Sequence, residues 1–101
     1  MQVFTKLSQN TLYVYLEGEL DQSVADGLRA ELDKCLMTSG VKRVVFNLKK
    51  LRFMDSTGIG LILGRYKKLR RNQIPLYFNE PSPQIDKVLK ISGLYDIIPV
   101  I

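Results

Sequence analysis

The stretch FMDSTGIG, residues 53 to 60, places an aspartate and two hydroxyl side chains directly before a pair of closely spaced glycines. Asp55, Ser56 and Thr57 are residue types that cap helices, attack substrates or receive phosphoryl groups. Glycines near a helix start are also typical of loops that bind phosphate. Four functions are therefore open for Ser56: helix cap, nucleophile, phosphate ligand and phosphoacceptor.

A nucleophilic serine is excluded by the residues around Ser56. The nucleophile elbow needs a glycine two positions earlier, where Met54 stands, and the chain has no histidine to take the proton. A carboxylate such as Asp55 is a poor base at neutral pH. The missing histidines and the single cysteine, Cys35, also exclude the common metal sites and an internal disulfide. We therefore expect no catalytic residue, no metal site, no cofactor and no enzyme activity.

Nucleotide hydrolysis is disfavoured on similar grounds. A Walker A loop ends in Gly-Lys-Ser/Thr, whereas no lysine follows these glycines until Lys67, and Asp55 would repel a bound phosphate. Two functions of Ser56 remain, and they are compatible. As an N-cap the serine would contribute about 1 kcal/mol. As a phosphoacceptor at a helix start it would gain roughly −1.5 to −2 charges and change the local surface from polar to anionic.

The charge of the chain is concentrated around this motif. The net charge is +5, but the block from residue 42 to residue 71 alone carries +9, and Asp55 is its one acid. A solvated helix face explains such a block, and so does electrostatic attraction of an acidic partner. Nucleic-acid binding is the alternative, although no stacking aromatic motif is interleaved with the basic residues.

Hydrophobic periodicity predicts a single α/β domain over residues 1–101, with a mixed sheet of four to five strands and helices packed against it. The expected order is β-β-α-β-α-β-α-β, which begins with a hairpin and continues with alternating strands and helices. Ser23 and Ser82 are the expected caps of the first and third helices. The expected strands cover 3–7, 12–16, 44–48, 75–78 and a short segment near Ile97 and Ile98, and the expected helices begin near 23, 56 and 82 and end near 39, 72 and 93.

The second predicted helix contains three glycines, Gly58, Gly60 and Gly64, each of which costs about 1 kcal/mol relative to alanine. Close packing of the helix on the sheet and close approach of a partner explain them equally well. If Ile59 or Leu61 is exposed beside them, it would form a flat apolar patch suited to docking.

Neither a membrane segment nor an export signal is expected. No run approaches the roughly 18 apolar residues of a membrane span, and MQVFTKLSQN lacks the basic and apolar pattern of a signal peptide. We expect a soluble cytoplasmic protein.

Three stretches resemble the STAS-domain family of anti-sigma factor antagonists: LEGELD at 16–21, VVFNLKKLRFMDSTGIGLILGRYK at 44–67 and ISGLYDII at 91–98. The resemblance is strongest to the sporulation branch, the antagonists of spore-forming bacteria, with the general-stress antagonists as the neighbouring branch. It implies a phosphoprotein that regulates transcription without contacting nucleic acid or membrane, and that is a monomer when free.

The resemblance also implies a mechanism and its residues. The unphosphorylated protein would bind an anti-sigma factor that is also a serine kinase, and so free the sigma factor. That kinase would phosphorylate Ser56 and switch binding off, and a serine phosphatase would reverse the reaction. Thr57 is the second hydroxyl of the motif and the alternative acceptor. The partner-binding residues implied in this way are Asp21, Asp55, Ser56, Thr57, Gly58, Ile59 and Gly60.

Overall fold

The computed structural model describes all residues from Met1 to Ile101 and confirms the expected mixed α/β fold. The helices match the sequence prediction closely. The elements are β1 (Gln2–Ser8), β2 (Thr11–Leu20), α1 (Gln22–Leu36), β3 (Arg43–Asn47), β4 (Leu51–Met54), α2 (Ser56–Arg71), β5 (Leu76–Asn79), α3 (Pro83–Ser92) and a 3-10 turn (Leu94–Asp96).

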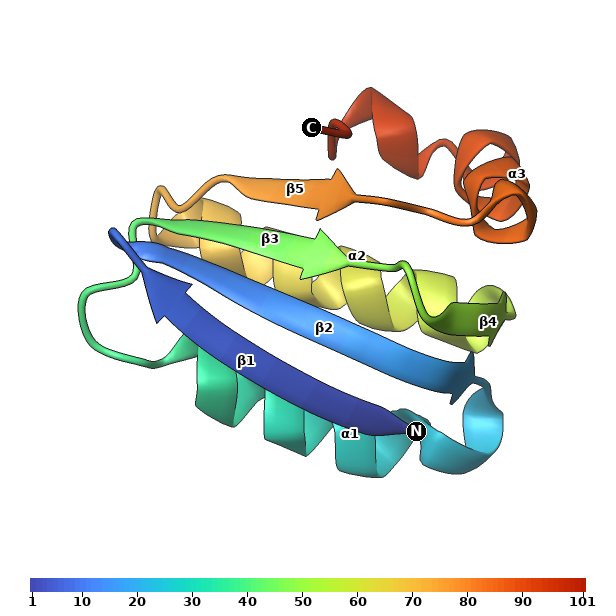
Figure 1. The fold of residues 1–101 in the computed structure, drawn as a ribbon, viewed down its shortest axis with the longest axis horizontal. Helices are drawn as coiled ribbons and strands as arrows, with labels where there is room; N and C mark the ends of the chain where they lie inside the picture. Colours follow the sequence, from blue (N-terminus) through green and yellow to red (C-terminus); the bar gives the residue numbers. More distant parts are fainter.

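The sheet has the order β1-β2-β3-β5, with β4 paired to β2 beyond the end of β3 (Figure 1). β1 and β2 form an antiparallel hairpin, and all other strand pairs are parallel. Both α1 and α2 lie on one face of this sheet, whereas no helix covers the other face in Figure 1. None of the three helices has the length and apolar character needed to cross a membrane.

Strand β2 is longer than its hydrophobic pattern suggests because it continues past Gly18. Gly18 has a positive φ of 116°, which glycine adopts without strain, and the register of the ladder shifts between Gly18 and Glu19. Its N–H donates to the carbonyl of Lys50 at 3.0 Å. The far half of β2 therefore pairs with β4, a strand that the predicted order does not contain.

The short strand predicted near Ile97 and Ile98 is wrong. The chain instead forms the 3-10 turn after Gly93, whose φ of 81° ends α3, and then makes a single parallel bridge between Phe78 and Val100. Ile98 is fully buried, so its apolar character reflects core packing rather than a strand.

The core lies between the sheet and helices α1 and α2, and residues of α3 and of the C-terminal segment also belong to it. Alternate residues of β2 point into it, so from Leu12 to Leu20 the even-numbered residues are buried and the odd-numbered ones are partly or fully exposed. The largest fully buried side chains include Leu16, Leu20, Leu32, Phe46, Ile62, Phe78, Ile85 and Leu89.

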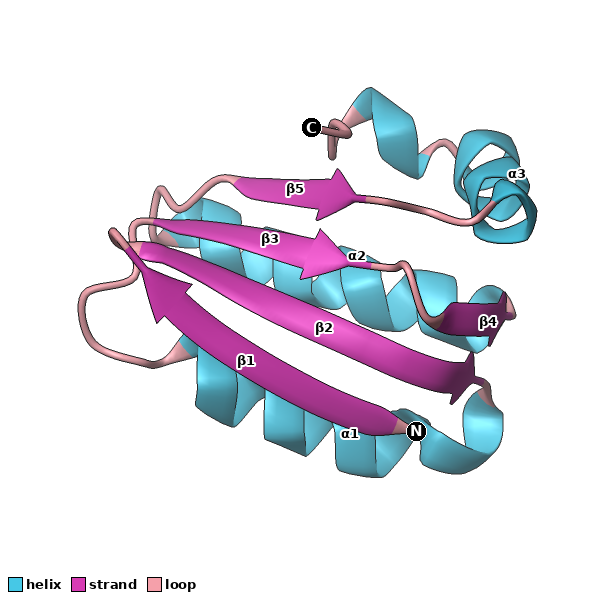
Figure 2. Cartoon of the chain, viewed as in Figure 1, coloured by secondary structure: helices cyan, strands magenta, loops and turns pink.

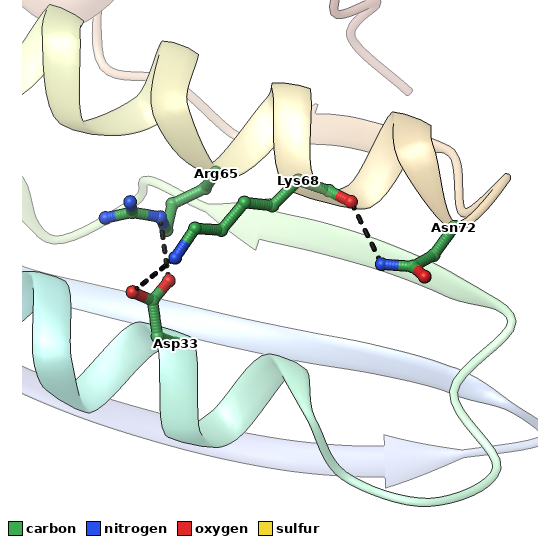
Figure 3. Close-up of polar contacts among 4 residues, drawn as sticks. All are labelled: Asp33, Arg65, Lys68 and Asn72. Atoms are coloured by element: carbon green, nitrogen blue, oxygen red, sulfur yellow. Dashed lines mark hydrogen bonds and ion pairs between the residues drawn. The ribbon is translucent and has the colours of Figure 1, made fainter.

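Helices α1 and α2 are joined by an ion-pair cluster centred on Asp33 of α1 (Figure 3). Arg65 Nε lies 2.9 Å from Asp33 Oδ1, and Lys68 Nζ lies 2.9 Å from Oδ2. The Arg65 side chain is only 6% exposed, whereas that of Asp33 is 29% exposed. The Nε–H of Arg65 is not aligned on the carboxylate, so this contact is an ion pair rather than a directed hydrogen bond. The cluster fixes how α2 lies beside α1.

Candidate functional site

The candidate site lies where two parallel strands end side by side. Leu20 of β2 is paired with Met54 of β4, and Asp21 and Asp55 directly follow these two residues. The N–H of Asp55 donates to the carbonyl of Leu20 at 3.3 Å. The helices that follow, α1 and α2, both begin at this end of the sheet (Figure 2). Two aspartates and two helix N-termini are thus brought together from distant parts of the sequence.

Asp55, not Ser56, caps α2. Asp55 Oδ1 accepts hydrogen bonds from the N–H groups of Thr57 at 3.0 Å and Gly58 at 3.2 Å. Ser56 is the first residue of the helix itself, so the prediction that it serves as the cap is wrong. The correction matters because the Ser56 side chain has no hydrogen-bond partner within the chain. Its hydroxyl is free for chemistry.

The start of α1 repeats this arrangement. Asp21 is the N-cap, and its carboxylate accepts from the N–H of Ser23 at 3.0 Å and from the Ser23 hydroxyl at 2.6 Å. The prediction of Ser23 as the cap is therefore wrong by two residues. The hydrogen bond from the Ser23 hydroxyl holds the pKa of Asp21 below its ordinary value, because it stabilises the charged form. Asp21 is a carboxylate at neutral pH.

The two hydroxyl side chains of the motif differ in accessibility. Ser56 is exposed, whereas Thr57 is partly buried. Two residues of β4, shortly before Ser56 in the sequence, are also exposed: Arg52, and Phe53 at 42%. The apolar character of Phe53 does not predict a surface position, and the only sequence signal for one is its charged neighbour, Arg52.

The glycines of α2 have different explanations. Gly58 is buried, and a Cβ atom there would lie 2.7 Å from Met54 Cγ and 2.8 Å from Leu20 Cγ. Close packing of α2 against Met54 and Leu20 therefore requires a glycine at position 58, and Gly58 lies beneath the surface of the site. Gly60 is exposed, and a Cβ atom there would meet nothing within 4 Å. Close packing on the sheet therefore does not explain Gly60.

The apolar residues beside these glycines also differ in burial. Ile59 is partly buried, and Leu61 is 3% exposed and belongs to the core. The exposed or partly exposed apolar residues close to Ser56 in the sequence are therefore Phe53 and Ile59, and an exposed patch at Leu61 is ruled out.

The same substitution at two glycines should have opposite effects on stability. Gly58→Ala is expected to lower the free energy of unfolding by about 1–3 kcal/mol, because overpacking forces Met54 and Leu20 to move. Gly60→Ala is expected to raise it by up to about 1 kcal/mol, because alanine favours the helix and fits the free space. Urea unfolding followed by circular dichroism measures both. Equal changes in the two variants would contradict this assignment.

The basic block around the motif is partly neutralised by acids from outside it. Arg65 and Lys68 share Asp33, and Lys50 Nζ lies 3.9 Å from Glu17 Oε2. Arg65 is buried and cannot reach a partner. The basic residues of this block, with their net charge of +9, therefore do not form a single solvated cationic surface. This finding weakens the alternative that the protein binds nucleic acid.

The fold is that of a small mixed α/β domain in which an aspartate caps a helix that begins with an exposed serine, Ser56. A family model of the STAS domain matches residues 3–101. The chain belongs to the STAS domain family.

Relatives of this chain are similar along almost its whole length. An anti-sigma F factor antagonist of Paenibacillus polymyxa is 34% identical over 100 residues, which cover 99% of this chain and 86% of that protein. An anti-sigma-B factor antagonist of Staphylococcus aureus is 34% identical over 94 residues, covering 92% of this chain and 86% of the relative. The structure of the anti-sigma factor antagonist SpoIIAA in its unphosphorylated form is 30% identical with a TM-score of 0.81, covering 99% of this chain and 88% of that one. The phosphorylated form of SpoIIAA from Bacillus gives a TM-score of 0.73 at 30% identity, covering 99% and 91% of the two chains.

Proposed function

We propose that this protein is an anti-sigma factor antagonist whose binding is switched off by phosphorylation of Ser56. The observation that carries the proposal is the exposed Ser56 hydroxyl at the first position of α2, left free because Asp55 supplies the cap. The relatives named as antagonists of anti-sigma factors support the partner class. The existence of a phosphorylated form of SpoIIAA supports the switch.

In the proposed mechanism the unphosphorylated protein acts in the cytoplasm as a binding module, not as an enzyme. It binds an anti-sigma factor that is also a serine kinase and thereby frees the sigma factor. The binding surface is formed by the exposed and partly exposed residues around the two helix starts, which are Asp21, Asp55, Ser56, Thr57, Ile59 and Gly60, with Phe53 added from the structure.

Phosphorylation transfers the γ-phosphoryl group of ATP to Ser56 Oγ, with ADP as the leaving group and the hydroxyl proton passing to a base of the kinase. The phosphorylated protein keeps its fold because the Asp55 cap does not use the Ser56 hydroxyl. The positive end of the α2 dipole tolerates the added charge, whereas Asp55 and Asp21 make the surface strongly anionic. A partner surface that fits the uncharged serine would then be repelled. A serine phosphatase restores the first state.

Relatives from both branches are similar to the chain. We propose the sporulation branch because two F-type relatives, at 34% and 35% identity, and both SpoIIAA structures, at 30% identity, are similar to the chain. The general-stress branch is the second candidate.

The test is phosphotransfer to a mapped residue. The protein is incubated with an anti-sigma F kinase and ATP, and the phosphate is located by mass spectrometry. We expect phosphate on Ser56 in the wild type and in Thr57→Ala, and none in Ser56→Ala. Phosphorylation of Ser56→Ala at the wild-type yield would overturn the assignment.

A further inference from the structure

One edge strand of the sheet is covered by another segment of the chain, and the other edge strand is not. On the β5 edge, the C-terminal segment covers the strand: the N–H of Phe78 donates to Pro99 at 2.9 Å, and the N–H of Ile101 donates to Phe78 at 2.9 Å. On the other edge, β1 pairs only with β2 and has no neighbour on its outer side (Figure 1). An uncovered edge offers unpaired backbone groups to another strand.

Strand β1 has only one of the features that normally block such pairing, the charge of Lys6. Gln2–Ser8 is seven residues long, contains no proline or glycine, and carries one charge, Lys6. All of its residues except the partly exposed Val3 are exposed, and they include two large apolar side chains, Phe4 at 50% and Leu7 at 45%. Natural edge strands are commonly blocked by charges, proline or bulges.

The hairpin turn shows which backbone groups of β1 are free. Gln9 and Asn10 both have positive φ, 49° and 68°, which is typical of a two-residue type I′ turn. In such a hairpin the flanking residues, here Ser8 and Thr11, exchange hydrogen bonds, and every second residue along β1 does the same with β2. The N–H and C=O groups of Val3, Thr5 and Leu7 therefore point outward.

We propose that β1 pairs antiparallel with β1 of a second copy of this chain, about a two-fold axis at Thr5. In this register Thr5 meets Thr5, Val3 meets Leu7, Phe4 meets Lys6 and Gln2 meets Ser8. Every outward-pointing residue meets another one, so the pairing forms up to about six backbone hydrogen bonds. Apolar Val3 and Leu7 lie on one face, and the Lys6 stem lies beside the Phe4 ring on the other.

Neighbouring registers are less favourable. A slip of two residues toward the turn places Lys6 directly opposite Lys6, and like charges in that position are destabilising. A slip of two residues the other way leaves Leu7 and Ser8 without a strand partner. A slip of one residue places outward groups opposite groups that are already bonded to β2.

This dimer does not depend on the proposed function, and it replaces the expectation of a free monomer. Because the two β1 strands run in opposite directions, the two copies present their Ser56 ends at opposite ends of the joined sheet. Both Ser56 residues stay accessible, so a dimer would carry two separate partner sites.

The test uses the fact that each candidate two-fold register pairs one position with itself. In a Cys35→Ser background, Thr5→Cys should form a disulfide-linked dimer on mild oxidation with diamide, because paired Cα atoms about 5.5 Å apart suit a disulfide. Lys6→Cys is the matched control and should remain monomeric. Separately, analytical ultracentrifugation of the wild type should show the average mass rising toward twice that of the monomer between about 10 µM and 1 mM, as expected for a small interface.

Thr5→Pro is expected to abolish the concentration-dependent mass increase, because proline removes an outward N–H that β2 does not use. Circular dichroism serves to show that this variant remains folded. A wild-type mass that stays at the monomer value up to 1 mM, with no Thr5→Cys crosslink, would overturn the proposal. A Phe4→Cys variant that crosslinks in place of Thr5→Cys would overturn the proposed register.

Discussion

Asp33→Ala is expected to lower the free energy of unfolding by about 2–4 kcal/mol, although Asp33 lies at neither the site nor the centre of the core. The substitution leaves the Arg65 guanidinium, 6% exposed, without a counter-charge. Removing one partner of a buried pair commonly costs about 3–5 kcal/mol, and the 29% exposure of Asp33 places this pair at the lower end. Since small domains are stable by about 5–15 kcal/mol, the loss is a large fraction of the total.

Chemical and thermal unfolding of four variants tests this account. For Asp33→Ala, the Tm should fall by roughly 10 °C or more, given about 4–8 °C per kcal/mol for a domain of this size. Lys68→Ala is the matched control. Its side chain is 50% exposed and touches the same carboxylate, so its loss should cost about 1 kcal/mol or less.

The remaining two variants separate the buried charge from the packing. Arg65→Met removes the charge and keeps much of the apolar stem, so it should cost less than Asp33→Ala. The double variant Asp33→Ala with Arg65→Met should be more stable than Asp33→Ala alone, because no unpaired buried charge remains. A double variant that loses the sum of both single effects would show that the ion pair is not the cause.

The sequence predicts the helices and the first strands well because their apolar residues recur at local spacings. It fails where a distant partner decides the outcome. β4 has four residues and exists because β2 continues past Gly18 to pair with it. Ile97 and Ile98 have a strand-like composition, but they form no strand. A 3-10 turn follows Gly93 immediately before them, and Pro99 immediately after them has no N–H to donate to a ladder.

The site shows the same limit at the level of single residues. Asp and Ser are both good caps, so Asp-Ser at 55–56 and Asp-Gln-Ser at 21–23 do not reveal which residue caps the helix. The backbone decides, because Asp21 and Asp55 are the last extended residues after paired strand ends. Arg65 is a further case, since its burial depends on Asp33, which lies 32 positions earlier in the sequence.

Ser56→Asp is expected to weaken binding of the anti-sigma partner roughly 100-fold or more, since like charges at an interface cost several kcal/mol and about 1.4 kcal/mol is tenfold. The new carboxylate stands beside Asp55 and near Asp21, so the partner meets a concentrated negative surface. The fold should not change, because Asp55 keeps its hydrogen bonds to Thr57 and Gly58, and an acid in the first turn suits the helix dipole.

Two controls separate this effect from a general effect of charge or shape. Ser56→Asn changes the shape without the charge and should bind nearly as well as the wild type. Ser8→Asp adds the same charge on an exposed residue beside the hairpin turn, at the other end of β2 from Asp21, and should also bind normally. Isothermal titration calorimetry with an anti-sigma F factor, at protein concentrations below those of self-association, measures all four affinities. If Ser56→Asp binds as tightly as the wild type, charge at this position is not the switch. If Ser56→Asn is equally weak, steric fit rather than repulsion controls the interface.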